Sequence, residues 1–218
     1  MNVSTDLRRY STLVFDCDGV VLDSNRVKTR AFYEAALPYG EAAAQKLVEY
    51  HVSHGGISRY KKFALFLAEM TDGRSGPGLE ELLESYATRV RDGLMSCDIA
   101  PGLKELRETT PDARWLIVSG GDQAELRDVF AARGIHENFN AGIFGSPDTK
   151  NEILARELSQ GTITGDALFL GDSKYDHQAS TAAGLDFVFV SDWTEVPGWD
   201  NWCAGNGIAS VRSLRELV

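Results

Sequence analysis

Residues 13–24, LVFDCDGVVLDS, decide the fold. The first three residues are apolar, a run that is typical of a buried parallel strand. Asp16 and Asp18 follow directly, and Gly19 permits a sharp change of direction. Ligands of open α/β sheets bind just beyond the carboxyl ends of the strands. Two carboxylates at this point therefore predict a site for Mg²⁺ and phosphate. The alternative is a loop of solvated acids with a turn glycine.

The composition indicates a folded, acidic protein. The 218 residues suffice for one large domain or for one domain with an insertion, and the 43% hydrophobic content supports a core. The net charge of -10 disfavours nucleic-acid binding, which depends on Lys and Arg neutralising phosphates. A small phosphate ester can still bind where a metal ion and local cations offset that charge.

Several sequence features favour a cytoplasmic protein. No stretch reaches the ~18 consecutive apolar residues of a membrane helix, and residues 1–10, MNVSTDLRRY, lack the apolar centre of a signal peptide. Cys17, Cys97 and Cys203 are far apart and form no CxxC pair. We therefore expect reduced thiols, no zinc site and no membrane association.

The middle of the first half is predicted to be helical. Apolar residues recur at helical spacing within 25–37, 41–52, 58–70 and 79–95, and segments rich in Gly or Pro separate these runs. A continuous helical stretch of this length suits a small unit of its own.

After residue 97 the pattern changes to strands that alternate with helices. Apolar runs predict strands at 115–118, 141–145, 167–170 and 187–190. Such alternation indicates βαβ units and a parallel sheet with both faces covered. Residues 191–207 are expected to form a loop, to which no role is assigned, and residues 211–217 are expected to form a closing helix.

The predicted fold class is therefore α/β, a doubly wound, Rossmann-like parallel sheet. We expect this core to comprise residues 1–20 and 97–218, with a helical cap of residues 21–96 inserted after the first strand. A lid over the strand ends can exclude water and reach a substrate.

Polar side chains follow the predicted strands at four places. Each has an ordinary explanation when taken alone, such as a serine that caps a helix, a solvent-exposed lysine or an acid at a helix N-terminus. Their order along the chain, each at or just after a strand, is what indicates a shared site. They are Asp16 with Asp18, Ser119, Lys150, and Asp172 with Asp176.

This set resembles the haloacid dehalogenase superfamily, in the branch of β-phosphoglucomutase-like and phosphoglycolate phosphatase-like enzymes with a helical cap. The first family motif, DxDGxxxDS, matches residues 16–24, and the fourth, GDxxxD, matches residues 171–176. Ser119 stands for the second motif and Lys150 for the third. The resemblance spans nearly the whole chain.

The resemblance implies a role for each acid. Asp16 would be the nucleophile and would form an aspartyl phosphate. Asp18 would be the general acid for the leaving alcohol and then the base that activates water. The Asp16 side chain, the Asp18 backbone carbonyl and the Asp172 side chain would be the protein ligands of Mg²⁺.

The resemblance also assigns the remaining core residues. Asp176 would hold the water shell of the metal or bind Lys150. Ser119 and the Gly120 amide would donate hydrogen bonds to phosphoryl oxygens, and Lys150 would neutralise charge on the transferring group.

Candidate substrate contacts in the cap are fewer. Residues 55–59, GGISR, resemble the specificity loop of β-phosphoglucomutase-like phosphatases, so Arg59 is the candidate for the far end of the substrate. The alternative is a solvent-exposed arginine. Lys62 could share that helix face. His51 and His54 are expected to be polar residues at the mouth of the cap rather than a metal pair.

The expected function is Mg²⁺-dependent hydrolysis of a small phosphomonoester, either a sugar phosphate or a phosphoglycolate-like compound. A phosphomutase shares the core motifs, but the mutase type carries a His where Lys28 stands. The presence of Asp18 argues against two other activities, those of a haloacid dehalogenase and of a phosphonatase. A non-catalytic binding protein on the same fold is the alternative from another class. The sequence predicts no oligomeric state.

Overall fold

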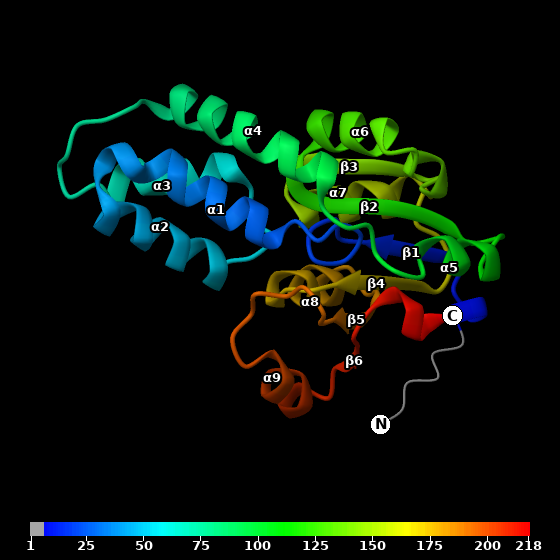
Figure 1. Ribbon diagram of the computed structural model, residues 1–218. Coiled ribbons are helices and arrows are strands. Elements are labelled where there is room, and N and C mark those ends of the chain that lie inside the picture. The colour runs from blue at the N-terminus through cyan, green and yellow to red at the C-terminus, as the bar shows by residue number, and fades with distance from the viewer. Residues whose placement is uncertain (1–6) are drawn as a thin grey trace.

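A six-stranded parallel sheet is the centre of the computed structural model, which describes residues 7–218 (Figure 1). The strand order is β3-β2-β1-β4-β5-β6. The predicted α/β class and parallel sheet are confirmed. Residues 1–6, which belong to the predicted core and to the stretch that lacks a signal-peptide pattern, lie outside the described residues. The strands are β1 (Thr12–Phe15), β2 (Arg114–Asp122), β3 (Gly142–Ser146), β4 (Ala167–Gly171), β5 (Asp186–Val190) and β6 (Ala209–Val211).

Both faces of the sheet are covered because successive side chains of a strand point to opposite sides. Leu13 and Phe15 of β1 belong to a core cluster that includes Leu106 of α5 and Phe130 of α6. Val14, between them, belongs to a second cluster with side chains of α7 and α8. The helices on the two faces are α5 (Leu103–Thr109) and α6 (Gln123–Ala132), then α7 (Lys150–Ser159) and α8 (Lys174–Ala182).

Five α-helices lie between β1 and β2 in the sequence, and the first four of them lie beside the sheet in space (Figure 1). They pack around aromatic rings: the centroid of Phe32 lies 5.1 Å from that of Phe63 and 4.4 Å from that of Tyr86. We propose that they form the expected cap, and we call them the cap below. They are α1 (Asn25–Ala36), α2 (Glu41–Ser53), α3 (Arg59–Glu69) and α4 (Leu79–Ser96).

Two chain segments join the cap to the sheet, and they are hydrogen-bonded to each other. Leu22 pairs with Ile99 in antiparallel fashion. The Asp23 amide donates to the Asp98 carbonyl at 2.9 Å. The entry to the cap and the exit from it therefore run side by side.

The C-terminal segment differs from the sequence-based expectation. Residues 191–207, expected to be a loop, contain helix α9 (Trp199–Asn206). Residues 211–217, expected to be a helix, begin with the last residue of β6 and end in a 3-10 turn (Leu214–Leu217). A strand of three residues that pairs with a distant partner leaves little local signal.

Within residues 7–218, no helix is long and apolar enough to cross a membrane. The three cysteines are free thiols: Cys17 and Cys203 are buried and Cys97 is half-buried.

Candidate active site

The candidate site lies where the carboxyl ends of three neighbouring strands meet. Strand β1 is flanked by β2 and β4, and Phe15 is in register with Ile117 and with Leu170. The next residue, Asp16, donates its amide to the Leu170 carbonyl at 2.9 Å. The chain leaves β1 towards β2 and later returns to β4 on the other side, so the sheet has a topological switch point here, where ligands of such folds bind.

Three buried carboxylates converge at this point from two predicted motifs. Asp16, Asp172 and Asp176 can each place an oxygen within 4.8 Å of the others. The Lys150 ammonium lies 2.9 Å from Asp16 Oδ1 and also forms an ion pair with Asp176. The structure therefore brings together four of the predicted site residues.

Helix ends position Lys150 and Asp176. Lys150 is the first residue of α7, which begins with a capping box made by Thr149. Asp176 is in the first turn of α8, where its Oδ2 accepts hydrogen bonds from the Ser173 amide at 3.1 Å and the Ser173 hydroxyl at 2.7 Å. Its Oδ1 remains for Lys150. Asp176 thus serves both as the helix-terminus acid and as the lysine partner that the sequence suggested.

The charge balance of this cluster fits a divalent cation. Burial raises the pKa of Asp16 to about 7, although the Lys150 charge opposes the shift. Burial and the neighbouring Asp16 charge raise the pKa of Asp172 well above its usual value. If a bound cation keeps all three carboxylates ionised, one ammonium leaves two of their negative charges for that cation to balance. Carboxylate oxygens are the donors that Mg²⁺ prefers, so the residues present suit that ion.

Gly19 is required by the same cluster. Its φ is +76°, a backbone conformation that side chains rarely adopt, and a Cβ there would overlap Asp172 Oδ2 and Asn25 Nδ2. The Asn25 amide donates to Asp172 Oδ2 at 2.7 Å. The turn after Asp18 therefore passes directly over the fourth-motif acid.

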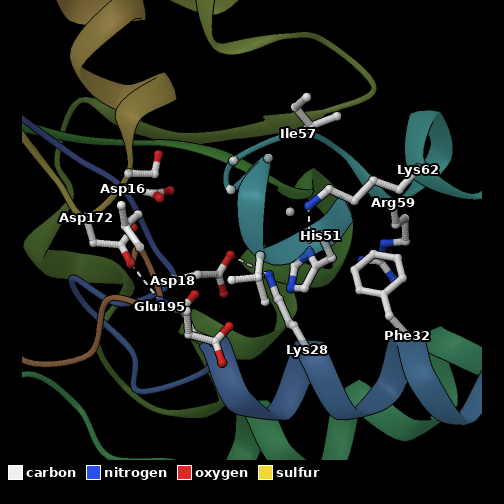
Figure 2. A pocket seen from close by; sticks show the side chains of 18 of the residues that line it. Asp16, Asp18, Lys28, Phe32, His51, Ile57, Arg59, Lys62, Asp172 and Glu195 are labelled. Atoms are coloured by element: carbon white, nitrogen blue, oxygen red, sulfur yellow. Dashed lines mark hydrogen bonds and ion pairs between the residues drawn. The ribbon is translucent and has the colours of Figure 1, made fainter. Parts of the chain in front are cut away.

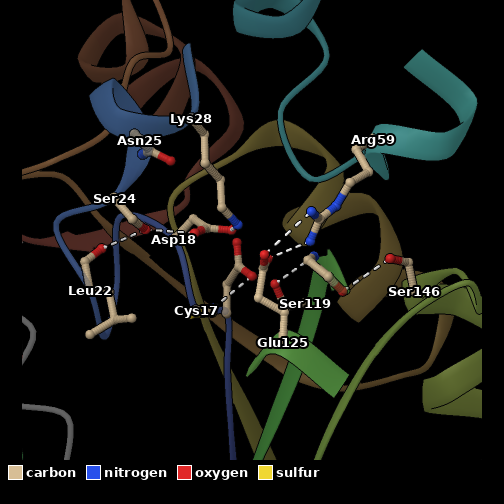
Figure 3. Close-up of polar contacts among 12 residues, drawn as sticks. Cys17, Asp18, Leu22, Ser24, Asn25, Lys28, Arg59, Ser119, Glu125 and Ser146 are labelled. Atoms are coloured by element: carbon tan, nitrogen blue, oxygen red, sulfur yellow. Dashed lines mark hydrogen bonds and ion pairs between the residues drawn. The ribbon is translucent and has the colours of Figure 1, made fainter. Parts of the chain in front are cut away.

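Asp18 is held by two side chains from the start of the cap (Figure 3). Lys28 Nζ lies 2.5 Å from Asp18 Oδ2, and the Ser24 hydroxyl donates to Asp18 Oδ1 at 2.5 Å. Burial alone would raise the pKa of Asp18, but the Lys28 charge and these hydrogen bonds hold it below its usual value. Asp18 is therefore ionised in this arrangement.

The second-motif residues lie at the end of β2. Ser119 is fully buried inside the strand, which extends beyond the predicted 115–118, and its Oγ accepts a hydrogen bond from the Gly121 amide at 3.0 Å. The pocket is lined by Gly120 and Gly121 but not by Ser119. A Cβ on Gly120 would overlap the Gly56 carbonyl of the cap, so the two backbones touch here.

A pocket lies between the cap and the carboxyl ends of the strands (Figure 2). Its cavity measures about 60 Å³. The sheet side contributes carboxylates, and the cap side contributes cations and aromatic rings. The main side chains are Asp16, Asp18 and Asp172 on one side, and Lys28, Phe32, His51, Arg59, Lys62 and Tyr86 on the other.

Arg59 lines this pocket but is not solvent-exposed. Its guanidinium forms an ion pair with Glu125 of α6, across the boundary between cap and sheet (Figure 3). It also lies over the Tyr86 ring, 5.0 Å from the centroid. The alternative of an exposed arginine is therefore wrong, whereas contact with a substrate stays a prediction.

The two cap histidines have different environments. His51 lines the pocket, and its Nδ1 lies 2.6 Å from Lys62 Nζ. His54 is exposed and stacks on Tyr50, with 4.1 Å between ring centroids. Only one member of the expected pair lies at the pocket.

Sequence reasoning gave no site role to three residues at the pocket. Lys28 is a charged residue on the buried face of α1, and that position was a usable signal. Asn25 holds Asp172, and Glu195 accepts a hydrogen bond from the Thr29 hydroxyl at 2.6 Å. Glu195 lies in the segment expected to be a loop, where no pattern marked it.

A family model described as haloacid dehalogenase-like hydrolase matches residues 13–190. No curated protein matches this chain.

Solved structures with the same fold share low sequence identity. A β-phosphoglucomutase from Clostridium difficile is 19% identical with a TM-score of 0.72, covering 96% of this chain and 93% of that one. A predicted phosphatase from Clostridium acetobutylicum is 16% identical with a TM-score of 0.71, covering 95% and 96%. CbbY from Rhodobacter sphaeroides, solved with phosphate, is 18% identical with a TM-score of 0.69, covering 95% and 96%.

Proposed function

Because this chain belongs to the haloacid dehalogenase-like hydrolase family, we propose that it is a Mg²⁺-dependent phosphatase that hydrolyses a small phosphomonoester through an aspartyl phosphate. The observation that carries the proposal is the convergence of Asp16, Asp172, Asp176 and Lys150 at the switch point of the sheet. Such a cluster can hold a phosphoryl group beside a nucleophilic carboxylate.

In the proposed mechanism, Asp16 attacks phosphorus, a new bond forms from its carboxylate oxygen, and the bond to the ester oxygen breaks. Asp18, which is ionised before the substrate binds, would take up the remaining proton of the phosphomonoester. It would give that proton to the departing alkoxide and then take a proton from water. That water attacks the aspartyl phosphate, the bond to Asp16 breaks, and inorganic phosphate leaves. The pocket position of Asp18, beside Asp16, supports this division of work.

The other polar groups would support the transfer. Lys150 would balance the charge of Asp16, to which it is already bound, and Ser119 and the Gly120 amide would donate to phosphoryl oxygens. Asp16, the Asp18 backbone carbonyl and Asp172 would hold Mg²⁺, with Asp176 beyond them. The ion would supply positive charge to the phosphoryl oxygens.

The position of the pocket, which is lined from both the cap and the sheet, supports a small substrate of the sugar phosphate or phosphoglycolate-like type. The acidic net charge of -10 supports a partner that is a small molecule rather than a nucleic acid. We place the enzyme in the cytoplasm.

A phosphomutase is the second candidate, because a β-phosphoglucomutase has the same fold. Lys28, bound to Asp18, stands where that type of mutase carries a His. A mutase would convert a sugar phosphate only when a sugar bisphosphate primes it, whereas the phosphatase releases inorganic phosphate without one.

Hydrolysis of p-nitrophenyl phosphate tests the proposal. With Mg²⁺ we expect turnover, and we expect roughly 10³-fold less after EDTA or in Asp16→Asn, because each removes charge or nucleophile from the transition state. The exposed Asp112→Asn is the matched control and should retain the wild-type rate. Equal background rates in all samples would support a non-catalytic binding protein instead.

A further inference from the structure

Lys62 on α3 is a buried cation that the mechanism above does not use. The residue is 1% exposed and lines the pocket. Its ammonium lies 2.6 Å from His51 Nδ1 and 5.5 Å from the centroid of the Phe32 ring. An ammonium has three donors, and in the part of the chain that the structure describes, no carboxylate lies within 4 Å of this one.

The neighbouring cations are already paired. Lys28 is bound to Asp18, and Arg59 is bound to Glu125. Lys62 is therefore the one cationic side chain of the pocket, among residues 7–218, that lacks a carboxylate partner. Burial of an ammonium without a counter-ion is unfavourable, and an anion bound in the cavity would stabilise the charged form of Lys62.

The Lys62 side chain faces the cavity, where an anionic group of a ligand could reach it. Figure 2 shows the Lys62 side chain reaching from α3 into the cavity, with its ammonium above His51 and with Lys28 reaching in from α1. Asp16 and Asp172 lie beyond them, on the sheet side of the same cavity. A ligand whose phosphate sits at Asp16 would direct its other end towards Lys62.

His51 can assist Lys62. When Lys62 is protonated, its ammonium donates to His51 Nδ1, so the proton of the neutral imidazole is on Nε2 and the ring keeps one N–H donor. Burial and the adjacent Lys62 charge lower the pKa of His51 well below its usual value, so the ring is neutral. A neutral donor beside a cation suits an anionic ligand.

We propose that the substrate is a small phosphomonoester with a second anionic group, a carboxylate or a second phosphate, and that Lys62 with His51 binds this group. This inference rests on the proposed function, since it takes the first phosphate to be at Asp16. It narrows the expected substrates, because a sugar monophosphate has no second anion to offer.

Matched pairs of esters test the inference. 2-Phosphoglycolate carries a carboxylate where 2-hydroxyethyl phosphate carries a neutral hydroxymethyl group. Ethane-1,2-diol bisphosphate carries a second phosphate group instead of the carboxylate. For the wild-type chain with Mg²⁺ we expect kcat/KM at least about tenfold higher for one of the two anion-bearing esters than for 2-hydroxyethyl phosphate. Which ester is preferred distinguishes a carboxylate from a phosphate.

The variant is Lys62→Met, which keeps most of the stem and removes the charge. Its preference ratio, rather than its absolute rate, is the readout, and we expect the ratio to fall to within about twofold of one. Lys61→Met, the exposed neighbour on the same helix, is the control and should retain the wild-type ratio. A wild-type chain without the preference, or a Lys62→Met chain that keeps it, would overturn the inference.

A binding measurement separates this inference from the proposed function. Calorimetric titration of the Asp16→Asn chain with the same esters, with and without Lys62→Met, needs no turnover. One outcome is that the wild-type chain hydrolyses no ester, but an anion-bearing ester binds at least about tenfold tighter than 2-hydroxyethyl phosphate, and only when Lys62 is present. In that case the phosphatase proposal fails and the anion site stands. Equal binding of all esters, or no binding, overturns the anion site. If Lys62→Met does not fold, the same measurements on Lys62→Gln, compared with the ester preference of the wild-type chain, test the anion site.

Discussion

Burial of the Lys62 ammonium makes the stability of this protein depend on pH. Burial and the nearby Lys28 charge lower the pKa of Lys62 from 10.5 to about 7. In the unfolded chain the same group stays protonated up to about pH 10. Between about pH 7 and 10 the unfolded state therefore binds more protons than the native state, and the free energy of unfolding rises with pH. Below about pH 7 the full penalty of the buried charge is present.

We predict that Lys62→Met is more stable than the wild-type chain at pH 6.5, because the variant has no buried charge. The difference should shrink by up to about 1.4 kcal/mol per pH unit as the pH rises towards 9. Urea denaturation of both chains at pH 6.5, 7.5 and 8.5 measures it. A difference that is constant with pH would contradict a lowered pKa of Lys62.

The core site residues could be predicted because their signal is local. An apolar run followed by Asp16, or one ended by Asp172, marks a strand end, and a parallel sheet collects its strand ends at one edge. Lys28 offered a different signal, a charge on the buried face of α1. Glu195 could not be found from the sequence, because its position at the pocket depends on how distant segments pack, which no local pattern encodes.

Among the elements, α1 and α4 pack closely because of a glycine. A Cβ on Gly93 of α4 would overlap Val27 Cγ1 of α1. Gly205 of α9 is the comparison position, because a Cβ there would meet no other atom within 4 Å. Both glycines are helical and have ordinary negative φ, so the two sites differ in packing.

We predict opposite effects of alanine at these two positions. Gly205→Ala should stabilise the fold by up to about 1 kcal/mol, which is the helix propensity gained. Gly93→Ala gains the same propensity but forces α1 and α4 apart, and we expect a net loss of about 1–3 kcal/mol. Thermal and urea unfolding measure both, and a Gly93→Ala chain as stable as Gly205→Ala would refute the close packing.

The strands with strong apolar runs were predicted, but the last elements were not. Helix α9 has Cys203 as its buried residue, and glycines with positive φ flank both ends. It is anchored by Trp199, which stacks on Phe189 of β5 with 5.6 Å between centroids. Because this contact is tertiary, the sequence of the helix itself shows no amphipathic pattern that would reveal it.

At the scale of the whole molecule, polar contacts hold the cap against the core. Arg59 is paired with Glu125, and both side chains are largely buried. The Tyr60 hydroxyl donates to Asp122 Oδ2 at 2.7 Å. These contacts join the start of α3 to the start of α6, next to the point where Gly56 touches Gly120.

We predict that Glu125→Gln loosens the cap, because it leaves the buried Arg59 charge without a full counter-charge. Amide hydrogen exchange in residues 54–60 should become at least about tenfold faster. Glu34→Gln is the control, since Glu34 pairs with Arg30 on the surface of the cap. Unchanged exchange after Glu125→Gln would show that this ion pair does not hold the cap closed.

Because the two linkers are hydrogen-bonded to each other where Leu22 pairs with Ile99, we expect them to act as one hinge between the cap and the sheet. Paired segments of this kind bend together, so we expect the four cap helices to move as one body. Such a movement would carry Lys28 and Lys62 away from the sheet, while Asp16 and Asp172 would stay at the strand ends. The residues proposed to recognise the substrate and those proposed to react with it thus lie on different parts of the chain. Substitutions in the cap could therefore change substrate preference during evolution and leave the reacting residues of the sheet intact.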